Sequence, residues 1–144
     1  MKRIALLMTI IPSILAILVL GSCNSDTVWD DIPYPITKFI SQYFPGQDAS
    51  SFTSNDEIYH VKLKNGPGMT FNSKFNWTDI NGYGERLPQV LLFDQLPPAL
   101  YEYLQTGELQ SDAISIERTT KQYIVVLIDT TVYFDIQTSK ITQG

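Results

Sequence analysis

The stretch that decides the fold is IYHVKLKNG, residues 58–66. Apolar residues alternate with polar ones along it: Tyr59, Val61 and Leu63 point one way, and His60, Lys62 and Lys64 point the other. Alternation with a period of two is typical of a strand with one face in the core and one in water. The Asn65-Gly66 pair that follows is a strong hairpin signal. The stretch therefore predicts a half-buried strand that turns back into an antiparallel neighbour.

The same pattern returns 64 residues later as Tyr123, Val125 and Leu127. Aligning residues 32–65 with the chain 64 positions on gives seven identities in 34 positions, where average composition would give about two. Deleting one residue then aligns Phe71-Asn72 with Phe134-Asp135. The pattern predicts two related units, residues 32–84 and 85–144, in one compact domain.

Each unit begins with a predicted helix. In the first, the apolar residues follow the spacing of one helical stripe: Ile36, Phe39, Ile40 and Tyr43. The matching stripe in the second unit is Leu96, Leu100, Tyr103 and Leu104. Pro33 and Pro97 suit a first helical turn, and Leu87–Phe93 is a further short helical segment. We expect an α+β fold in which each repeat places a helix, or a helix pair, on one face of an antiparallel meander.

The N-terminus has the features of a signal peptide, residues 1–22. Lys2 and Arg3 precede 17 residues, 4–20, that are mostly apolar and too few for an ordinary membrane span. The run LGSC, residues 20–23, resembles the lipobox of bacterial lipoproteins. That resemblance implies cleavage before Cys23 and its acylation, whereas an ordinary secretory signal with a chance cysteine is the alternative.

Cleavage there would leave 122 residues with a net charge of −7. Residues 23–31 are polar and acidic, so we expect a tether between lipid and fold. Trp29 within it could pack onto the domain or lie at the membrane interface.

Composition excludes several functions. The full chain has 144 residues, a net charge of −5, one cysteine and one histidine. One cysteine rules out a disulfide framework, and one histidine rules out a His-cluster metal site. The acidic balance disfavours nucleic acid as a ligand. We expect no cofactor, no metal and no catalytic group.

The residue pattern also resembles a known family. The positions that carry the resemblance are Ile32-Pro33, Tyr43-Phe44-Pro45-Gly46, Tyr59-x-Val61-x-Leu63-x-Asn65-Gly66, Phe71-Asn72 and Trp77, followed by Leu87-Pro88 and Leu96-Pro97. They are similar to the PepSY-like, β-lactamase-inhibitor-like proteins of the bacterial envelope. The resemblance implies an exported protein with two helix-plus-sheet repeats. One departure is Phe75, which stands where the family's turn usually carries glycine.

The outward faces of the two units differ. The first offers His60 and Lys62, whereas the second offers an apolar set: Ile124, Val126, Ile128 and Tyr133. A strand that is apolar on both faces is buried in the monomer or covered by a partner. These six residues are the candidate partner-binding face.

Three functions remain open. The first is a non-catalytic, lipid-anchored envelope module, on the periplasmic side or the outer membrane, that binds a protein partner and inhibits an exported enzyme, as the resemblance implies. The second is a structural lipoprotein that self-associates into homo-oligomers. The third is a small metal-dependent hydrolase using His60 and carboxylates.

Overall fold

The computed structural model describes residues 28–144. The predicted signal peptide and Cys23 lie outside the described residues. The elements follow in the order η2 (Val28–Asp31), α2 (Tyr34–Tyr43), β1 (Ala49–Asn55), β2 (Ile58–Leu63), β3 (Gly68–Phe71), β4 (Trp77–Asn81), α3 (Gln89–Gln95), α4 (Pro98–Thr106), η3 (Gln110–Asp112), β5 (Ala113–Arg118), β6 (Gln122–Leu127), β7 (Thr131–Asp135) and β8 (Ile141–Gln143).

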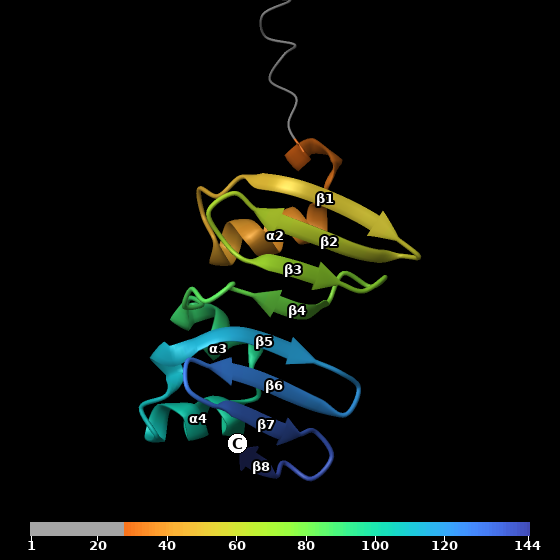
Figure 1. Ribbon diagram of the computed structural model, residues 1–144. Helices are drawn as coiled ribbons and strands as arrows, with labels where there is room; N and C mark the ends of the chain where they lie inside the picture. Colours follow the sequence, from red (N-terminus) through yellow and green to blue (C-terminus); the bar gives the residue numbers. More distant parts are fainter. Residues whose placement is uncertain (1–27) are drawn as a thin grey trace, which may run out of the picture.

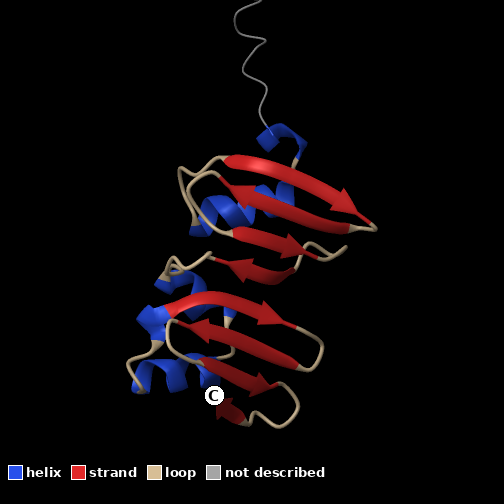
Figure 2. Ribbon diagram, in the orientation of Figure 1, coloured by secondary structure: helices blue, strands red, loops and turns tan. Residues whose placement is uncertain are grey.

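All eight strands form one antiparallel sheet in chain order. Helices α2, α3 and α4 cover one face, and the described chain leaves the other face open, as Figures 1 and 2 show. The α+β class and the placement of helices on one face agree with the prediction. The sequence did not predict the pairing of β4 with β5, which joins the two meanders into one continuous sheet.

The two halves have the same register. In the β1–β2 hairpin Ala49 pairs with Leu63, and in the β5–β6 hairpin Ala113 pairs with Leu127, 64 positions later. Each hairpin also has an irregularity just after that alanine. This geometry is consistent with the predicted repetition.

Proline and turn residues set the helix ends. Pro33 and Pro97 are N-cap residues, one position earlier than expected, and Pro35 and Pro98 occupy the first turns. A proline is tolerated there because the first N–H groups of a helix have no intrahelical partner. Helix α4 ends at Gly107, as predicted, and the extra helical segment is α3.

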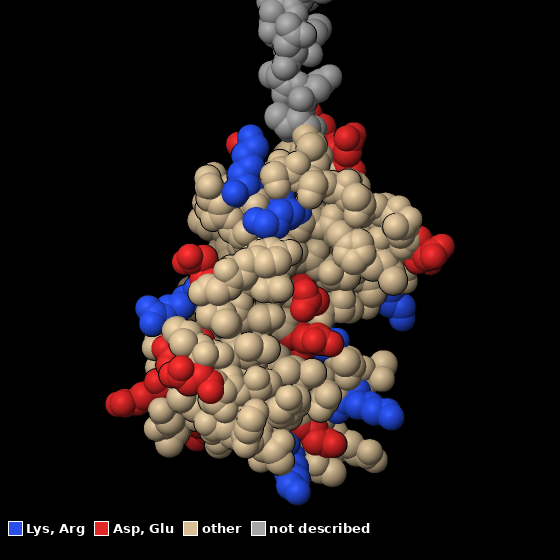
Figure 3. Space-filling view, viewed as in Figure 1, with Lys and Arg blue, Asp and Glu red and all other residues tan. Residues whose placement is uncertain are grey.

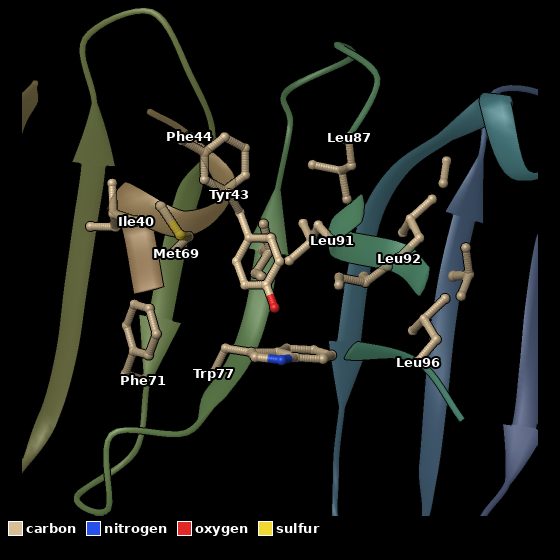
Figure 4. Close-up of a cluster of buried hydrophobic side chains, with 14 of the residues drawn as sticks. Ile40, Tyr43, Phe44, Met69, Phe71, Trp77, Leu87, Leu91, Leu92 and Leu96 are labelled. Atoms are coloured by element: carbon tan, nitrogen blue, oxygen red, sulfur yellow. The ribbon is translucent and has the colours of Figure 1, made fainter. Parts of the chain in front are cut away.

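The core lies between the helices and the covered face of the sheet. Figure 4 shows Ile40 and Tyr43 of α2 facing Met69 and Phe71, with Leu91 and Leu92 of α3 beyond Trp77. Tyr59, Val61 and Leu63 lie on this side, as the alternation predicted. A single hydrophobic cluster spans both halves.

Two local features complete the fold. Val28 and Trp29 pack against the core, so the last residues of the predicted tether belong to the folded part. Phe75 adopts a left-handed backbone with φ of 64°, the conformation that glycine adopts most readily. Its ring stacks on Tyr59 with centroids 5.3 Å apart. Within residues 28–144, no helix is both long and apolar enough to cross a membrane.

Candidate functional site: the open face of the sheet

Cross-strand pairing arranges the open face into rows. One row runs through every strand: Thr53, His60, Thr70, Asp79, Glu117, Ile124, Tyr133 and Thr142. A neighbouring row contains Lys62 and Val126. Because side chains alternate between faces along a strand, every member of these rows projects away from the helices.

The second half of this face carries an apolar cluster, which we define as Ile124, Val126, Ile128 and Tyr133. Ile124 and Val126 are half-buried, whereas Ile128 is 48% and Tyr133 38% exposed. Ile124 pairs directly with Tyr133 across β6 and β7. The sequence left two alternatives for this face, burial within the monomer or cover by a partner. Full burial by residues 28–144 is excluded, because these side chains remain partly exposed to solvent.

The first half of the face is polar and slightly hollowed. His60 is exposed, and its Nδ1 lies 3.1 Å from Thr70 Oγ1. A hollow of about 130 Å³ lies among His60, Thr70, Lys62, Asp79 and Tyr83. Its volume matches one amino-acid side chain more closely than a cofactor, because ligand pockets typically span roughly 300–1,000 Å³.

Two carboxylates meet at the centre of the face. Asp79 of β4 and Glu117 of β5 are direct cross-strand partners, and red atoms mark this junction in Figure 3. Burial raises the pKa of Asp79, the Glu117 charge raises it further, and His60 opposes both. Like charges directly opposite one another destabilise a sheet, so the fold gains nothing from this pair. Sequence reasoning missed it because the two residues belong to different halves.

The structure brings together only part of the predicted face. Ile124, Val126 and Tyr133 lie together on β6 and β7 and Ile128 directly follows β6, but His60 and Lys62 lie on β2, with β3, β4 and β5 between them and β6. At about 4.8 Å per strand, this separation is about 19 Å. His60 and Lys62 therefore do not border the apolar cluster. Glu117 does border it, because Glu117 is the cross-strand partner of Ile124.

The arrangement offers little for catalysis. The hydrogen-bonding partner of His60 is Thr70 on β3, and within the described residues no third group orients the imidazole in the manner of a triad. Within residues 28–144, no three or more His, Cys, Asp or Glu side chains gather in a way that could hold a metal ion.

Comparison with known proteins agrees with this fold. The family model described as "Putative beta-lactamase-inhibitor-like, PepSY-like" matches residues 23–79 and 57–141. The chain belongs to this PepSY-like family. A search of curated proteins finds no match.

Several solved structures resemble this PepSY-like chain. A "putative calcium-regulated periplasmic protein" from Bacteroides thetaiotaomicron aligns with a TM-score of 0.64 and 25% identity, covering 78% of this chain and 90% of that one. A "putative periplasmic protein" from Bacteroides vulgatus gives a TM-score of 0.66 at 23% identity, covering 80% and 91%. A second from that organism, of unknown function, gives 0.64 at 22%, covering 80% and 93%. The last two likenesses bear on the fold alone.

Proposed function

We propose that this protein is an exported, lipid-anchored binding module of the bacterial envelope that acts without catalysis, through the open face of its sheet. The observation that carries the proposal is the apolar cluster on a face that no described helix covers. Export is supported by the signal-like N-terminus and by a structural neighbour described as periplasmic. Anchoring through Cys23 is supported by the LGSC run.

The chemistry of the face suits a protein partner. Tyr133 belongs to the aromatic type that is enriched at interfaces, and Val126 adds apolar surface on the same face. A partner that covers Ile124, Val126 and Tyr133 would remove apolar surface from water, at about 25 cal/mol per Å². The partner we expect therefore presents an apolar patch next to a basic group, which would face Asp79 and Glu117. The family's description makes an exported enzyme the leading candidate for that partner, with inhibition as the outcome.

The test starts from capture and ends with a measured affinity. The full chain, immobilised in detergent, is exposed to solubilised envelope, and any retained protein is purified and titrated against it. Val126→Asp is expected to weaken binding by at least about 30-fold, as for a hot-spot residue. Thr53→Asp is the matched control, because it adds the same charge to the same face, on β1. It is expected to leave the affinity unchanged.

Two results would refute the proposal. Equal affinity for the wild type and a folded Val126→Asp variant would show that the apolar cluster does not bind the partner. Concentration-dependent dimers that Val126→Asp abolishes would instead favour the self-associating lipoprotein, and sedimentation velocity distinguishes the two cases.

A further inference from the structure

A second concave site lies at one end of the sheet, where the β2–β3 connection approaches the β4–α3 connection. It is a cavity of about 610 Å³, within the range of small-molecule pockets. Its lining comes from residues 44–47, 62–67 and 82–88, and we call it the connection pocket. It lies in the first half and at the joint between the halves, away from the apolar cluster of β6 and β7.

The lining of the connection pocket is cationic in an acidic chain. Residues 28–144 contain eight Lys and Arg residues, and three of them line this one cavity: Lys62, Lys64 and Arg86. Glu85 is the one acidic residue in the lining. In Figure 3, blue atoms gather at this end of the first four strands. The concentration of positive charge is opposite to the protein's overall balance, so the pocket favours an anion.

Lys62 is held at the pocket by partners that carry no charge. Its Nζ donates to the carbonyl oxygens of Leu63 and Gly66, both at 2.7 Å. The same nitrogen lies 5.3 Å from the centroid of the Tyr83 ring. An ammonium has three hydrogens, and these partners carry no formal charge. Neither ion pair found within residues 28–144 includes Lys62, so its positive charge is not neutralised there.

The other two cations are held only loosely. Lys64 lies 4.0 Å from Asp48, and Arg86 lies 3.8 Å from Asp112. Exposed pairs at such distances contribute little. Both side chains can therefore turn toward a ligand at small cost.

One wall of the connection pocket is formed by Tyr83 and the closely packed backbone around it. Tyr83 has a φ of 52°, and its N–H donates to Asn81 Oδ1 at 2.8 Å. The Tyr83 ring lies over Gly68, where any Cβ would approach the hydroxyl to 2.7 Å. A Cβ on Gly82 would collide with the carbonyl oxygens of Glu85 and Ile114. Glycine at positions 68 and 82 therefore leaves room for the Tyr83 ring and for the close turn that follows β4.

Beside the charged residues, the lining has the polar side chains of Gln47 and Asn65 and an apolar part. Phe44, Pro67, Leu87 and Pro88 contribute to it. We propose that the connection pocket binds a small organic anion, in which a carboxylate or phosphate group is carried on an apolar or aromatic body. The charged group meets Lys62 and Arg86, and the body lies against Tyr83 and Leu87. This site is independent of partner binding at the apolar cluster.

Calorimetry with three matched compounds tests the proposal. The full chain in non-ionic detergent is titrated with naphthoate, naphthyl phosphate and the uncharged naphthamide. We expect at least one anion to bind about tenfold or more tightly than naphthamide, with an affinity that falls as salt is added. Comparison of the two anions identifies the preferred group. Equal binding of all three compounds, or no binding of either anion, would overturn the proposal.

Variants locate the site. Arg86→Gln is expected to weaken anion binding about fivefold, and Lys62→Met about tenfold or more, because each removes a charge from the pocket. Lys140→Gln is the control, since it removes a charge far along the chain, between β7 and β8. Lys62→Met could disturb the β2–β3 turn, but the Arg86 side chain is 65% exposed, so its variant should fold. Unchanged binding in folded Arg86→Gln and Lys62→Met would refute the assignment.

Discussion

The two halves of the sheet have matching registers in their first hairpins but differ in their surface. On the covered face, Val61 and Val125 are equivalent and both are buried. On the open face, His60 corresponds to Ile124, and Lys62 corresponds to Val126. Packing against helices restricts the first set to apolar residues of similar size. The open face is free of that restriction, because no described helix packs against it (Figure 1).

A second difference lies in the fourth strand of each half. Trp77 of β4 pairs with Phe71, and Ile141 of β8 pairs with Phe134 at the corresponding place. Trp77 is fully buried, and its strand β4 is paired on both sides. Ile141 is half-buried, and its strand β8 is the last of the sheet. The indole Nε1 donates to Gln95 at 2.9 Å, and the Arg118 guanidinium lies over the ring.

Removing these two side chains should have the largest and most unequal effect. Trp77→Ala is expected to lower the free energy of unfolding by about 3–5 kcal/mol, through a cavity in the shared core. Ile141→Ala is expected to cost about 1 kcal/mol, because the neighbouring chain can relax around a half-exposed site. Urea denaturation of both variants measures the difference. Equal losses would contradict the expectation that the fully buried Trp77 contributes more to stability than the half-buried Ile141.

Two helix tyrosines provide the next comparison. Tyr43 of α2 donates to Asp94 at 3.0 Å and accepts from Gln95 at 2.8 Å, and so links the first half to α3. Burial raises the pKa of Tyr43, and the Asp94 carboxylate raises it further, whereas the Gln95 hydrogen bond opposes both. Figure 4 shows its hydroxyl pointing toward Trp77. Tyr103 of α4 donates instead to Gln143 in an exposed setting.

Tyr43→Phe is expected to destabilise the protein by about 1–2 kcal/mol, because the half-buried Gln95 side chain loses a partner, whereas Asp94 is exposed and can bind water instead. Tyr103→Phe is expected to change the unfolding free energy by less than about 0.5 kcal/mol, since water replaces its bond. Thermal and urea unfolding of the pair would show whether the network at the joint is the stronger one. A larger loss in Tyr103→Phe would contradict this.

The smallest expected effect concerns the acidic pair where the halves meet. The raised pKa of Asp79 means that the folded state holds this proton more tightly than the unfolded state does. Its contribution to stability therefore falls as the pH rises from the ordinary carboxyl pKa through the raised value. Asp79→Asn is expected to raise the unfolding free energy at pH 7 by a few tenths of a kcal/mol, the size of a cross-strand pair term.

Unfolding experiments between pH 4 and 7 test this. The Asp79→Asn variant should show a weaker loss of stability with rising pH than the wild type, with little difference at the acidic end. Glu117→Gln should act in the same direction, because it removes the same repulsion. A variant less stable than the wild type at neutral pH would show that the Asp79 carboxylate is stabilising instead.

Some parts of the molecule could be predicted because their signals are local. Alternation at Tyr59, Val61 and Leu63 predicted which side of β2 is buried, and the Asn65-Gly66 pair predicted the turn to β3. Strand β8 was not predicted, since Ile141–Gln143 is three residues long and shows no alternation. The apolar face of β6 was visible in sequence, but its exposure depended on where the helices lie.

The sequence by itself determined the class of elements and the identity of the core side, because periodicity and turn chemistry act between near neighbours in the chain. Only the tertiary structure decided that β4 pairs with β5, that Asp79 faces Glu117, and that Lys62 and Arg86 share a pocket with Tyr83. Such contacts join residues far apart in sequence. The energies of these contacts depend on distance, burial and shape. None of these produces a periodic pattern of residues in the sequence.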